Sequence, residues 1–450
     1  MRIAIFVHCF FPAHFYGTET YTLELARNLR QMGHEAIVVS AVFPGERRQE
    51  RLVSYYEYEG LPVYSLDKNY LPHTSVKDTY YQPALRDTLR QLIKELHPDL
   101  IHVAHLINHT AALLEVASEL GIPTVATFTD FFGFCFNNKL EAADGSLCRG
   151  PNRKRTNCVA CLLKARAQQP RAGLAERVAG RYPFSRLSAA ALDQVIRVPG
   201  FRQGPLAGFV RDVTCRPDTL LHWYSHYRAA IAPTKFLREA YTSNGLKIPI
   251  HRVPFGVEIA RERKPRRAPR ETLRFGFIGQ IAPHKGTHVL MNAFRQLPPS
   301  SRAELHIFGP EDQEAGYVTR LRRLAVDGRV HFRGTFPKEQ MAHVFSELDF
   351  LVIPSTWYEN SPLVLLYALA SHTPVVVSDV PGMTEFVEPG QNGYAFRRGS
   401  VRDLAGVLRH IVQDPERARE MAATTHYERT PSAVARDVVE VYGSILCRQV

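Results

Sequence analysis

The sequence predicts two doubly wound parallel α/β domains that follow one another along the chain. Short apolar or β-branched runs alternate with helical patterns, and this alternation stops near the middle of the chain and then restarts. The length of 450 residues agrees, because a single hydrophobic core rarely serves more than roughly 250–300 residues. With 45% hydrophobic and 22% charged residues, the composition is that of a folded globular protein.

The first series of elements predicts an N-terminal Rossmann-like domain over residues 1–255. We expect strands at 2–7, 36–42, 99–103, 124–128 and 229–232, and helices at 18–32, 83–96 and 111–120. An insertion rich in cysteine and arginine interrupts this domain at about 135–225. The order of strands and crossover helices is the one typical of a parallel sheet.

The second series predicts a C-terminal Rossmann-like domain over residues 273–425. We expect strands at 273–278, 304–308, 330–333, 350–353 and 374–377, with a helix from about 287, one that ends near 325 and one from 362. The basic, proline-punctuated stretch 256–272 is the predicted linker. Residues 426–450 are expected to form a helix that packs back on the N-terminal domain.

The formal net charge of +12 is concentrated in the insertion. Residues 151–220 contain 13 Arg or Lys and 4 Asp or Glu, a difference of 13 − 4 = +9. Such a surface either binds anionic partners or is a solvated basic face that packs on the N-terminal domain. No motif with interleaved aromatic residues indicates nucleic-acid binding, which leaves phosphate groups and an anionic membrane surface as the candidate partners.

The chain is expected to be cytoplasmic, with the inner face of a membrane as a second, peripheral location. No apolar run approaches the roughly 20 residues that a membrane span needs. The seven cysteines are too few for a disulfide scaffold at this length.

Several enzyme classes lack their signatures in this sequence. It contains no G-x-G-x-x-G, Walker P-loop, G-x-S-x-G or H-E-x-x-H motif, which argues against dehydrogenases, P-loop enzymes, serine hydrolases and zincins. There is also no Asp-x-Asp pair, a common carboxylate grip on a metal-bound nucleotide sugar. We therefore expect no cofactor to be required for catalysis.

Two strand-to-helix loops of the C-terminal domain are suited to a phosphorylated ligand. Lys285 follows the strand at 273–278, at the edge where ligands bind in open parallel sheets. The second loop, 354–361, leads into a helix whose first position suits Pro362. Free amides near Leu363 and the helix dipole can bind an anion, while Glu359 can accept hydrogen bonds from sugar hydroxyls.

At these loops the sequence resembles the retaining glycosyltransferases of family 4, which have the GT-B fold. The resemblance runs along most of the chain, through these segments: Phe10-Phe11-Pro12, Gly17-Thr18-Glu19, His97-Pro98-Asp99-Leu100-Ile101-His102, Ala230–Thr234, Gly279–Gly286, Pro354-Ser355, Glu359–Val364, Val375–Ser378, Pro381-Gly382, Glu385 and Asn392-Gly393. It implies two Rossmann-like domains that face each other across a cleft. It also implies that a nucleotide diphosphate sugar is the donor.

The resemblance further implies a distribution of roles. Lys285 would bind the donor phosphate and Glu359 the sugar hydroxyls, while the N-terminal domain would recognise a glycan or lipid-linked saccharide as acceptor. Hexosyl transfer would proceed with retention of configuration and without an enzymic nucleophile. The residues expected to bind the donor are Gly17, Thr129, Gly279, Gln280, Lys285, Glu359, Asn360, Ser361, Pro362, Leu363 and Tyr367.

Three of these positions depart from the family's pattern. Tyr367 replaces the second glutamate of the E-x7-E motif, which usually holds the nucleotide ribose. Gln280 replaces the usual arginine of the diphosphate loop, and Thr129 replaces a histidine near the donor sugar. Two alternatives therefore stay open: a nucleotide-sugar epimerase on the same fold, and a degenerate homologue that binds donor without transferring it.

Four cysteines and one histidine complete the set of candidates. Cys135, Cys148, Cys158 and Cys161 fall within 27 residues, and the last two have the C-x-x-C spacing of a chelating pair. Four thiolates can hold a structural zinc ion, although buried, metal-free cysteines are the alternative. His105 follows an N-domain strand, and we expect it to orient an acceptor hydroxyl.

Overall fold

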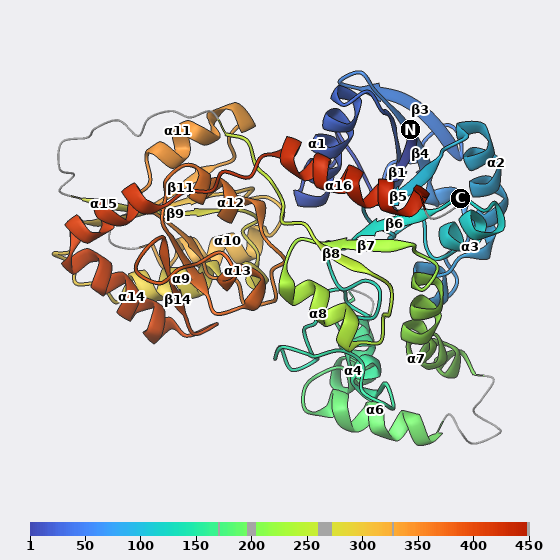
Figure 1. Ribbon diagram of the computed structural model, residues 1–450. Helices are drawn as coiled ribbons and strands as arrows, with labels where there is room; N and C mark the ends of the chain where they lie inside the picture. Colours follow the sequence, from blue (N-terminus) through green and yellow to red (C-terminus); the bar gives the residue numbers. More distant parts are fainter. Residues whose placement is uncertain (170–171, 196–203, 260–271, 326–327, 448–450) are drawn as a thin grey trace. The chain divides into compact units, whose positions relative to one another are not determined.

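The computed structural model describes residues 1–169, 172–195, 204–259, 272–325 and 328–447, which form two compact units (Figure 1). Unit 1 comprises Met1–Pro254 and Ser432–Val450, and unit 2 comprises Phe255–Pro431. Most of the predicted linker, residues 260–271, lies outside the described residues, as do parts of the basic insertion, 170–171 and 196–203.

Unit 1 is built on an eight-stranded sheet in the order β3-β4-β2-β1-β5-β6-β7-β8. Its strands are β1 (Arg2–Phe6), β2 (Glu35–Val42), β3 (Val53–Tyr58), β4 (Leu61–Asp67), β5 (Leu100–Val103), β6 (Thr124–Thr127), β7 (Ala229–Ala232) and β8 (Ile250–Arg252). Every neighbouring pair is parallel except β3 and β4. Strands β5, β6 and β7 are buried throughout, as expected for parallel strands covered on both faces.

The helices of unit 1 include a separate group in the insertion. They are α1 (Gly17–Gln31), α2 (Arg86–Leu96), α3 (Ala112–Glu119), α4 (Thr156–Ala167), α5 (Leu174–Ala179), α6 (Phe184–Val195), α7 (Pro205–Tyr224), α8 (Lys235–Ser243) and α16 (Pro431–Leu446). Although α16 is last in the chain, it packs on unit 1, where the Tyr442 hydroxyl lies 2.7 Å from His102 Nδ1. His102 Nε2 in turn lies 3.0 Å from Thr127 Oγ1, so a buried polar chain ties α16 to β5 and β6.

The hairpin β3–β4 is an element that the sequence pattern did not reveal. Tyr58 pairs with Leu61, and the two loop residues Glu59 and Gly60 both have positive φ, 51° and 73°. Positive φ at both central positions is the geometry of a tight hairpin turn whose twist matches that of the strands. The hairpin extends the edge of the parallel sheet beyond β2.

Unit 2 is a six-stranded, wholly parallel sheet in the order β11-β10-β9-β12-β13-β14. Its strands are β9 (Leu273–Ile278), β10 (Ala303–Phe308), β11 (Val330–Gly334), β12 (Phe350–Ile353), β13 (Val375–Ser378) and β14 (Gly393–Phe396). Its helices are α9 (Thr287–Phe294), α10 (Ala315–Arg322), α11 (Met341–Ser346), α12 (Leu363–Ala370), α13 (Pro381–Thr384), α14 (Val401–Gln413) and α15 (Pro415–Thr424).

One hydrophobic core holds unit 2 together. Phe275 and Phe350, from the adjacent central strands β9 and β12, stack with their ring centroids 6.0 Å apart. Helices α9 and α14 bury Leu290 and Leu404 in the same cluster. Two parallel α/β units confirm the predicted fold class. Within the described residues, none of the helices has both the length and the apolar character needed to cross a membrane.

Candidate active site

The loops that follow β9, β12 and β13 meet at one edge of the sheet in unit 2. They meet because the carboxyl ends of neighbouring parallel strands lie at the same edge. The Thr356 amide donates to the His284 carbonyl at 2.8 Å, and the Ser378 hydroxyl donates to the Ser355 carbonyl at 2.6 Å. Residues nearly 100 positions apart are thereby fixed against one another.

Lys285 and Glu359 form an ion pair at the centre of these loops. Lys285 Nζ lies 2.7 Å from Glu359 Oε1, and the same oxygen accepts hydrogen bonds from Ser355 Oγ at 2.7 Å and Trp357 Nε1 at 2.8 Å. The Glu359 side chain is 9% exposed and that of Lys285 is 24% exposed. An ammonium group has three N–H donors, so one bond to Glu359 leaves Lys285 able to bind a phosphate as well.

The surroundings of Glu359 keep its carboxylate ionised. Burial alone would raise its pKa, but the charge of Lys285 and the hydrogen bonds from Lys285, Ser355 and Trp357 outweigh burial and lower the pKa. The three donors converge on Oε1, and Oε2 receives none of them. The site therefore presents a fixed negative acceptor beside a partly exposed cation.

Two glycines let these loops approach more closely than other residues would. Gly286 has φ +73°, and a Cβ built on it would lie 1.8 Å from the Pro354 carbonyl oxygen. A Cβ on Gly382, the second residue of α13, would lie 1.6 Å from the carbonyl oxygen of Glu359. Both contacts are with backbone, so no side-chain rotation relieves them, and the loop positions depend on glycine.

The helix at the N-terminus of which we predict anion-binding amides is α12, and it begins one residue later than expected. Pro362 is not the first helical residue: its ψ of 127° is extended, so it is the N-cap and Leu363 begins the helix. The preceding Ser361 has φ 58°, donates its amide to the Gly382 carbonyl at 3.1 Å, and is 2% exposed. Its Oγ is buried and has no hydrogen-bond partner among the described residues, so it is available to a ligand.

The other predicted donor residues of unit 2 lie around this centre. Gly279 directly follows β9 and its amide donates to the Phe308 carbonyl at 3.0 Å, and Gln280 Nε2 donates to Gln313 Oε1 at 3.1 Å. Tyr367 lies in the second turn of α12 and is only 7% exposed. Asn360 follows Glu359 directly and is half-buried.

Arg398 is a site residue that motif reading missed. It follows β14, at the same edge of the sheet, and its guanidinium donates to the Thr356 carbonyl at 2.5 Å. Its amide donates to Asp379 Oδ1 at 2.7 Å, just beyond β13. This places a second cation on the loop that carries Glu359. The sequence signal was its position two residues after a strand, which is weak because Arg398 lies 113 positions from Lys285.

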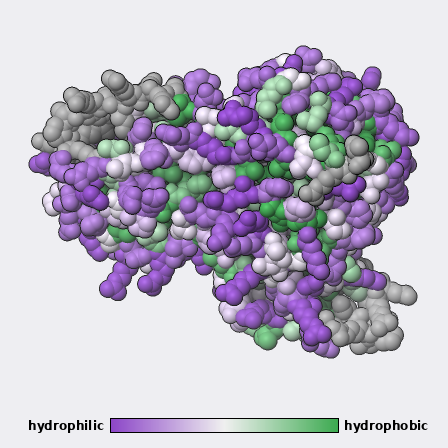
Figure 2. Space-filling model, in the orientation of Figure 1, coloured by the Kyte–Doolittle hydropathy of each residue, from purple (hydrophilic) through white to green (hydrophobic). Residues whose placement is uncertain are grey.

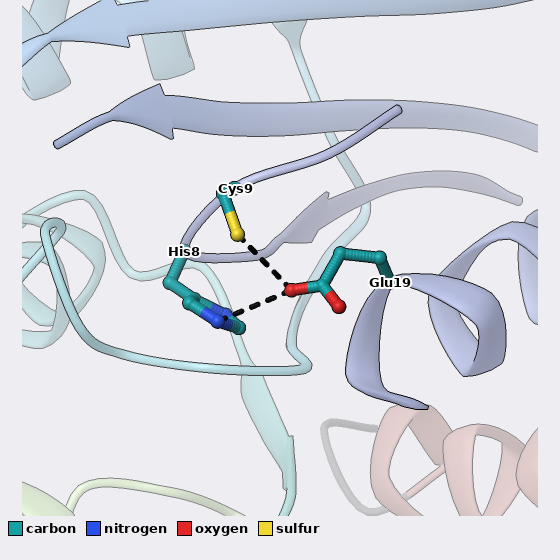
Figure 3. Close-up of side chains that lie close together, drawn as sticks. All are labelled: His8, Cys9 and Glu19. Atoms are coloured by element: carbon teal, nitrogen blue, oxygen red, sulfur yellow. Dashed lines mark hydrogen bonds and ion pairs between the residues drawn. The ribbon is translucent and has the colours of Figure 1, made fainter. Parts of the chain in front are cut away.

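Unit 1 carries a different polar group at the end of β1. Figure 3 shows His8 and Cys9 pointing toward Glu19 of α1, with His8 Nε2 and Cys9 Sγ each 3.1 Å from Glu19 Oε1. Burial, followed by the nearby His105, lowers the pKa of His8 well below its usual value. Burial and Glu19 raise the pKa of the Cys9 thiol. Both neighbours of Glu19 are therefore neutral near pH 7.

Two atoms of this group lack hydrogen bonds. His8 Nδ1 and Glu19 Oε2 are buried and have no partner in the described part of the chain. A buried acceptor without a donor costs free energy, roughly 1–3 kcal/mol, unless water or a ligand satisfies it. The group is thus suited to accept hydrogen bonds from hydroxyl groups.

His105 lies beside this group, as part of a small pocket. Its ring centroid is 4.5 Å from that of His8, and its Nε2 lies 3.0 Å from Asp130 Oδ2. Thr129 lines the same pocket, together with His105 and Asp130. Gly17, by contrast, is the exposed first residue of α1. His8, Glu19 and Asp130 were not among the predicted site residues.

The four cysteines predicted as possible zinc ligands lie in the insertion of unit 1. In the sequence they are distant from the polar groups around Lys285 and Glu19. Cys135, Cys148, Cys158 and Cys161 line one pocket. They do not form a group at metal-ligand spacing. Among the described residues, the groups with ligand atoms within 4.8 Å of one another are His8–Cys9–Glu19 and Glu304–His306–His331.

Two family models match the chain. The model described as glycosyl transferases group 1 matches residues 258–426, and the one described as glycosyltransferase family 4 matches residues 15–144. The first match contains Lys285 and Glu359, and the second contains Glu19 and His105. The two matches thus include residues from the polar groups of both units, although His8 and Cys9 precede the second match.

Curated relatives and solved structures agree with these matches. A D-inositol 3-phosphate glycosyltransferase of Stackebrandtia nassauensis is 34% identical over 194 residues, which are 40% of this chain and 44% of the relative. A glycogen synthase of Mycobacterium tuberculosis is 30% identical over 199 residues, 42% of this chain and 46% of the relative. The chain thus aligns with less than half the length of these relatives.

Two solved structures share the fold over nearly the whole chain. Anabaena HepE, crystallised with UDP and glucose, has a TM-score of 0.62 and 15% identity, covering 99% of this chain and 100% of its own. Sucrose-phosphate synthase of Thermosynechococcus elongatus has a TM-score of 0.63 and 17% identity, covering 99% of both chains. At these identities the likeness establishes the fold alone.

Proposed function

The chain belongs to the glycosyltransferases of GT-B fold, and we propose that it transfers a hexosyl group from a nucleotide diphosphate sugar to an acceptor hydroxyl. The observation that carries the proposal is the ion pair of Lys285 with buried Glu359 at the carboxyl edge of the unit 2 sheet. A diphosphate needs a cation, and sugar hydroxyls need a fixed acceptor. This pair supplies both from two adjoining loops.

The donor is assigned to unit 2 by its charges. Lys285 binds a phosphate oxygen, helped by the amides at the start of α12 and by the buried Ser361 hydroxyl. Arg398 supplies a second positive charge, which offsets the absence of an arginine at Gln280. Glu359, held ionised, accepts from the sugar hydroxyls. The Anabaena structures with UDP and UDP-glucose support a nucleotide-sugar donor.

The acceptor is assigned to unit 1. His8, Glu19 and His105 form a group of hydrogen-bonding side chains with unsatisfied acceptor atoms, the complement of a hydroxyl-rich substrate. A glycan or lipid-linked saccharide has the hydroxyl groups that such a site binds. His105 accepts at Nδ1 from the Ile107 amide and lies with Nε2 at 3.0 Å from Asp130, so we assign it to positioning the reacting hydroxyl through the Asp130 carboxylate.

The resemblance to family 4 implies transfer with retention, and the side chains of the site allow the corresponding chemistry. The bond from the anomeric carbon to the phosphate oxygen breaks, and the acceptor oxygen bonds to that carbon on the same face. The acceptor proton passes to the departing phosphate oxygen, so no enzymic nucleophile is needed. The protein contributes positioning and electrostatic stabilisation of the leaving diphosphate.

Product analysis tests this proposal against its alternatives. The purified full chain is incubated with UDP-, ADP- and GDP-sugars, with and without a panel of saccharide acceptors, and the products are identified by NMR. Release of nucleoside diphosphate with an α-linked product from an α-linked donor supports retaining transfer. Isomerised donor in the absence of acceptor indicates an epimerase, and tight donor binding without any product indicates a non-catalytic homologue; either contradicts the proposal.

We further propose that helices α5 and α6 contact an anionic membrane on its cytoplasmic face. Five large apolar side chains are exposed there: Leu174 at 80%, Leu187 at 65%, Phe184 at 50%, Val178 at 49% and Tyr182 at 48%. Arg177, Arg181 and Arg186 are exposed between them. Apolar residues also reach the surface at the lower end of the molecule in Figure 2, where Figure 1 places α6. Apolar and basic side chains together are typical of an interfacial surface.

Vesicle co-sedimentation tests this surface. Wild-type protein should bind vesicles that contain phosphatidylglycerol and be released at high salt, because screening weakens the arginine contribution. The double variant Leu174→Asp, Leu187→Asp should bind at least tenfold less. The matched control Tyr55→Ser alters an exposed aromatic residue of β3 and should bind normally. Equal binding of all three proteins would contradict the proposal.

A further inference from the structure

The side chain of Trp357 contacts both members of the ion pair in unit 2. Its Nε1 donates to Glu359 Oε1 at 2.8 Å, and Lys285 Nζ lies over its ring, 5.1 Å from the centroid. An ammonium group within about 6 Å of an indole face is attracted by the electrons of the ring. One side chain thus contacts the carboxylate through its N–H edge and the cation through its face.

The position of the Trp357 indole is fixed by the two loops that meet at it. The His284 ring packs against the indole, with the ring centroids 4.3 Å apart and the planes at 59°. Just before Trp357, the Thr356 amide and hydroxyl both donate to the His284 carbonyl, at 2.8 and 3.1 Å. Arg398 donates to the Thr356 carbonyl. The indole is therefore anchored on one strand-to-helix loop and packed against the other.

Apolar packing does not account for a tryptophan at this position. Trp357 is half-buried, and among the described residues it is not part of the hydrophobic core cluster of unit 2. Phenylalanine and leucine would offer apolar surface there but no N–H donor. The indole differs from them because it combines a donor with an extended π face, and both have charged partners here.

Donor binding, as proposed above, changes the contacts of the ion pair. A donor phosphate competes with Glu359 for the Lys285 ammonium, which leaves the bonds from Ser355 and Trp357 to hold Oε1. With Oε1 held, the carboxylate keeps one orientation, and Oε2 remains the oxygen that accepts from the sugar hydroxyls. The ammonium stays near the indole face while it turns to the phosphate.

We infer that Trp357 is a positioning residue that holds Glu359 in place for the donor sugar and Lys285 in place for the donor diphosphate. The inference rests on the proposed function of unit 2. The N–H fixes the carboxylate, so its loss affects recognition of the sugar. The ring face holds the ammonium, so its loss affects binding of the diphosphate. Because the two roles belong to different parts of one side chain, substitutions can separate them.

Calorimetric titration measures the two roles separately. The probes are the tightest-binding member of a panel of UDP-, ADP- and GDP-sugars and the matching nucleoside diphosphate. Trp357→Phe keeps a ring face but lacks the N–H, so it should bind the nucleoside diphosphate within about twofold of wild type and the nucleotide sugar about tenfold more weakly. Trp357→Leu lacks both, so it should also bind the nucleoside diphosphate about fivefold more weakly.

Trp223→Phe is the matched control for these variants. Trp223 is the other tryptophan of the chain and stacks on Tyr81 in unit 1, with the ring centroids 6.2 Å apart, so its loss should leave the binding of both probes unchanged. Equal weakening of both probes in Trp357→Phe, or unchanged binding by both Trp357 variants, would overturn the inference. A wild-type chain that binds neither probe would instead contradict the proposed function.

A measurement without donor tests the contact itself and covers the case in which the Trp357 variants fail to fold. The indole N–H signal of Trp357 is observed by NMR with isotopically labelled tryptophan and identified by its persistence in Trp223→Phe. It should move upfield in Glu359→Gln, since a neutral amide is a weaker acceptor than a carboxylate. It should not move in Glu388→Gln, at an exposed glutamate of unit 2. A signal unchanged in Glu359→Gln would overturn the inference whether or not the chain binds nucleotide sugars.

Discussion

The polar groups that follow the strands differ in charge between the two units. In unit 2, Lys285 is a cation paired with a carboxylate whose pKa is lowered. In unit 1, Glu19 is flanked by His8 and Cys9, whose pKa shifts both favour the neutral form. A retained cation suits a diphosphate, whereas neutral groups with open acceptors suit hydroxyl groups. A shared sheet architecture therefore does not determine the chemistry of a site, which depends on the residues of its loops.

Removal of the unit 2 cation should have the largest effect. Lys285→Ala should lower kcat/KM by about a thousandfold, since it removes the main stabiliser of the leaving diphosphate. Lys285→Arg should recover part of the loss, and Lys235→Ala, at an exposed lysine of α8, should change nothing. Steady-state kinetics at varied donor concentration measures the effect. Near-normal turnover of Lys285→Ala would contradict the assignment of the donor to unit 2.

Changes to the unit 1 group should affect the acceptor and spare the donor. Glu19→Gln and His105→Gln should raise the acceptor KM by roughly 10- to 100-fold, the cost of losing a hydrogen bond to a charged or oriented group. Calorimetric donor affinity should stay unchanged. Glu24→Gln on the same helix is the control. If these variants lost donor affinity instead, the assignment of the acceptor to the unit 1 group and the donor to the unit 2 group would be wrong.

The close backbone contact at Gly382 should make unit 2 sensitive to one methyl group. Gly382→Ala should lower unit 2 stability by about 1–3 kcal/mol and weaken nucleotide binding, because its Cβ meets the Glu359 carbonyl. Gly406→Ala, where nothing lies within 4 Å of the added carbon in α14, should be neutral or stabilising. Thermal unfolding and calorimetry measure both variants. If the two variants unfolded at the same temperature and bound nucleotide equally well, the close backbone contact at Gly382 would not be needed to hold the site.

Acid should destabilise unit 1 before unit 2. Burial lowers the pKa of His102 to about 3 and that of His109 to about 4. Unfolding lets each take up a proton below its ordinary value near 6.5, so unit 1 loses up to about 1.4 kcal/mol per pH unit per histidine as the pH falls from there. In unit 2, burial also lowers the pKa of His288 and His306, but by less than it lowers those of His102 and His109, so unit 2 should lose less stability over this pH range. The lowered pKa of Glu359 contributes stability that is lost only below about pH 4.3.

Hydrogen exchange at pH 7 and pH 5 separates these contributions. Protection should fall in β5, which contains His102, and in its neighbour β6, while the strands of unit 2 lose less protection. His102→Gln should remove the contribution of one histidine, up to about 1.4 kcal/mol per pH unit, from the pH dependence of the free energy of unfolding. If β9 and β12 lost protection first, the assignment of acid sensitivity to the buried histidines would be wrong.

The sequence predicted the fold well where burial determines the pattern. The strands at 229–232, 273–278 and 350–353 match the structure to the residue. Those at 229–232 and 350–353 are continuous apolar runs, as expected for parallel strands buried on both faces, and the one at 273–278 is interrupted by a single charged residue, Arg274. The β3–β4 hairpin was missed because its outer face is exposed and its residues are polar and aromatic, without a continuous run. Its Glu59-Gly60 turn lacks the commonest Asn-Gly signal.

The site was predictable only in part, for a geometric reason. Lys285 and Glu359 follow neighbouring strands, so strand order brings them together and their motifs are local. The place of Arg398 depends on how the loop after β14 lies against that of Thr356, and the His8–Glu19 contact depends on how the loop after β1 returns to the start of α1. His8 had no distinguishing pattern in a chain with 19 histidines. Its environment appears only once β1, α1 and the loop of His105 are placed in space.

Hydrogen–deuterium exchange with bound donor tests the central claim most directly. The full chain is measured with and without the best-binding member of a panel of UDP-, ADP- and GDP-sugars. We predict protection of residues 279–286 and 354–363 in unit 2, and its loss in Lys285→Ala at the same donor concentration. Failure of every nucleotide sugar to bind, or protection that leaves these two loops unchanged, would contradict the assignment of the donor to Lys285 and Glu359.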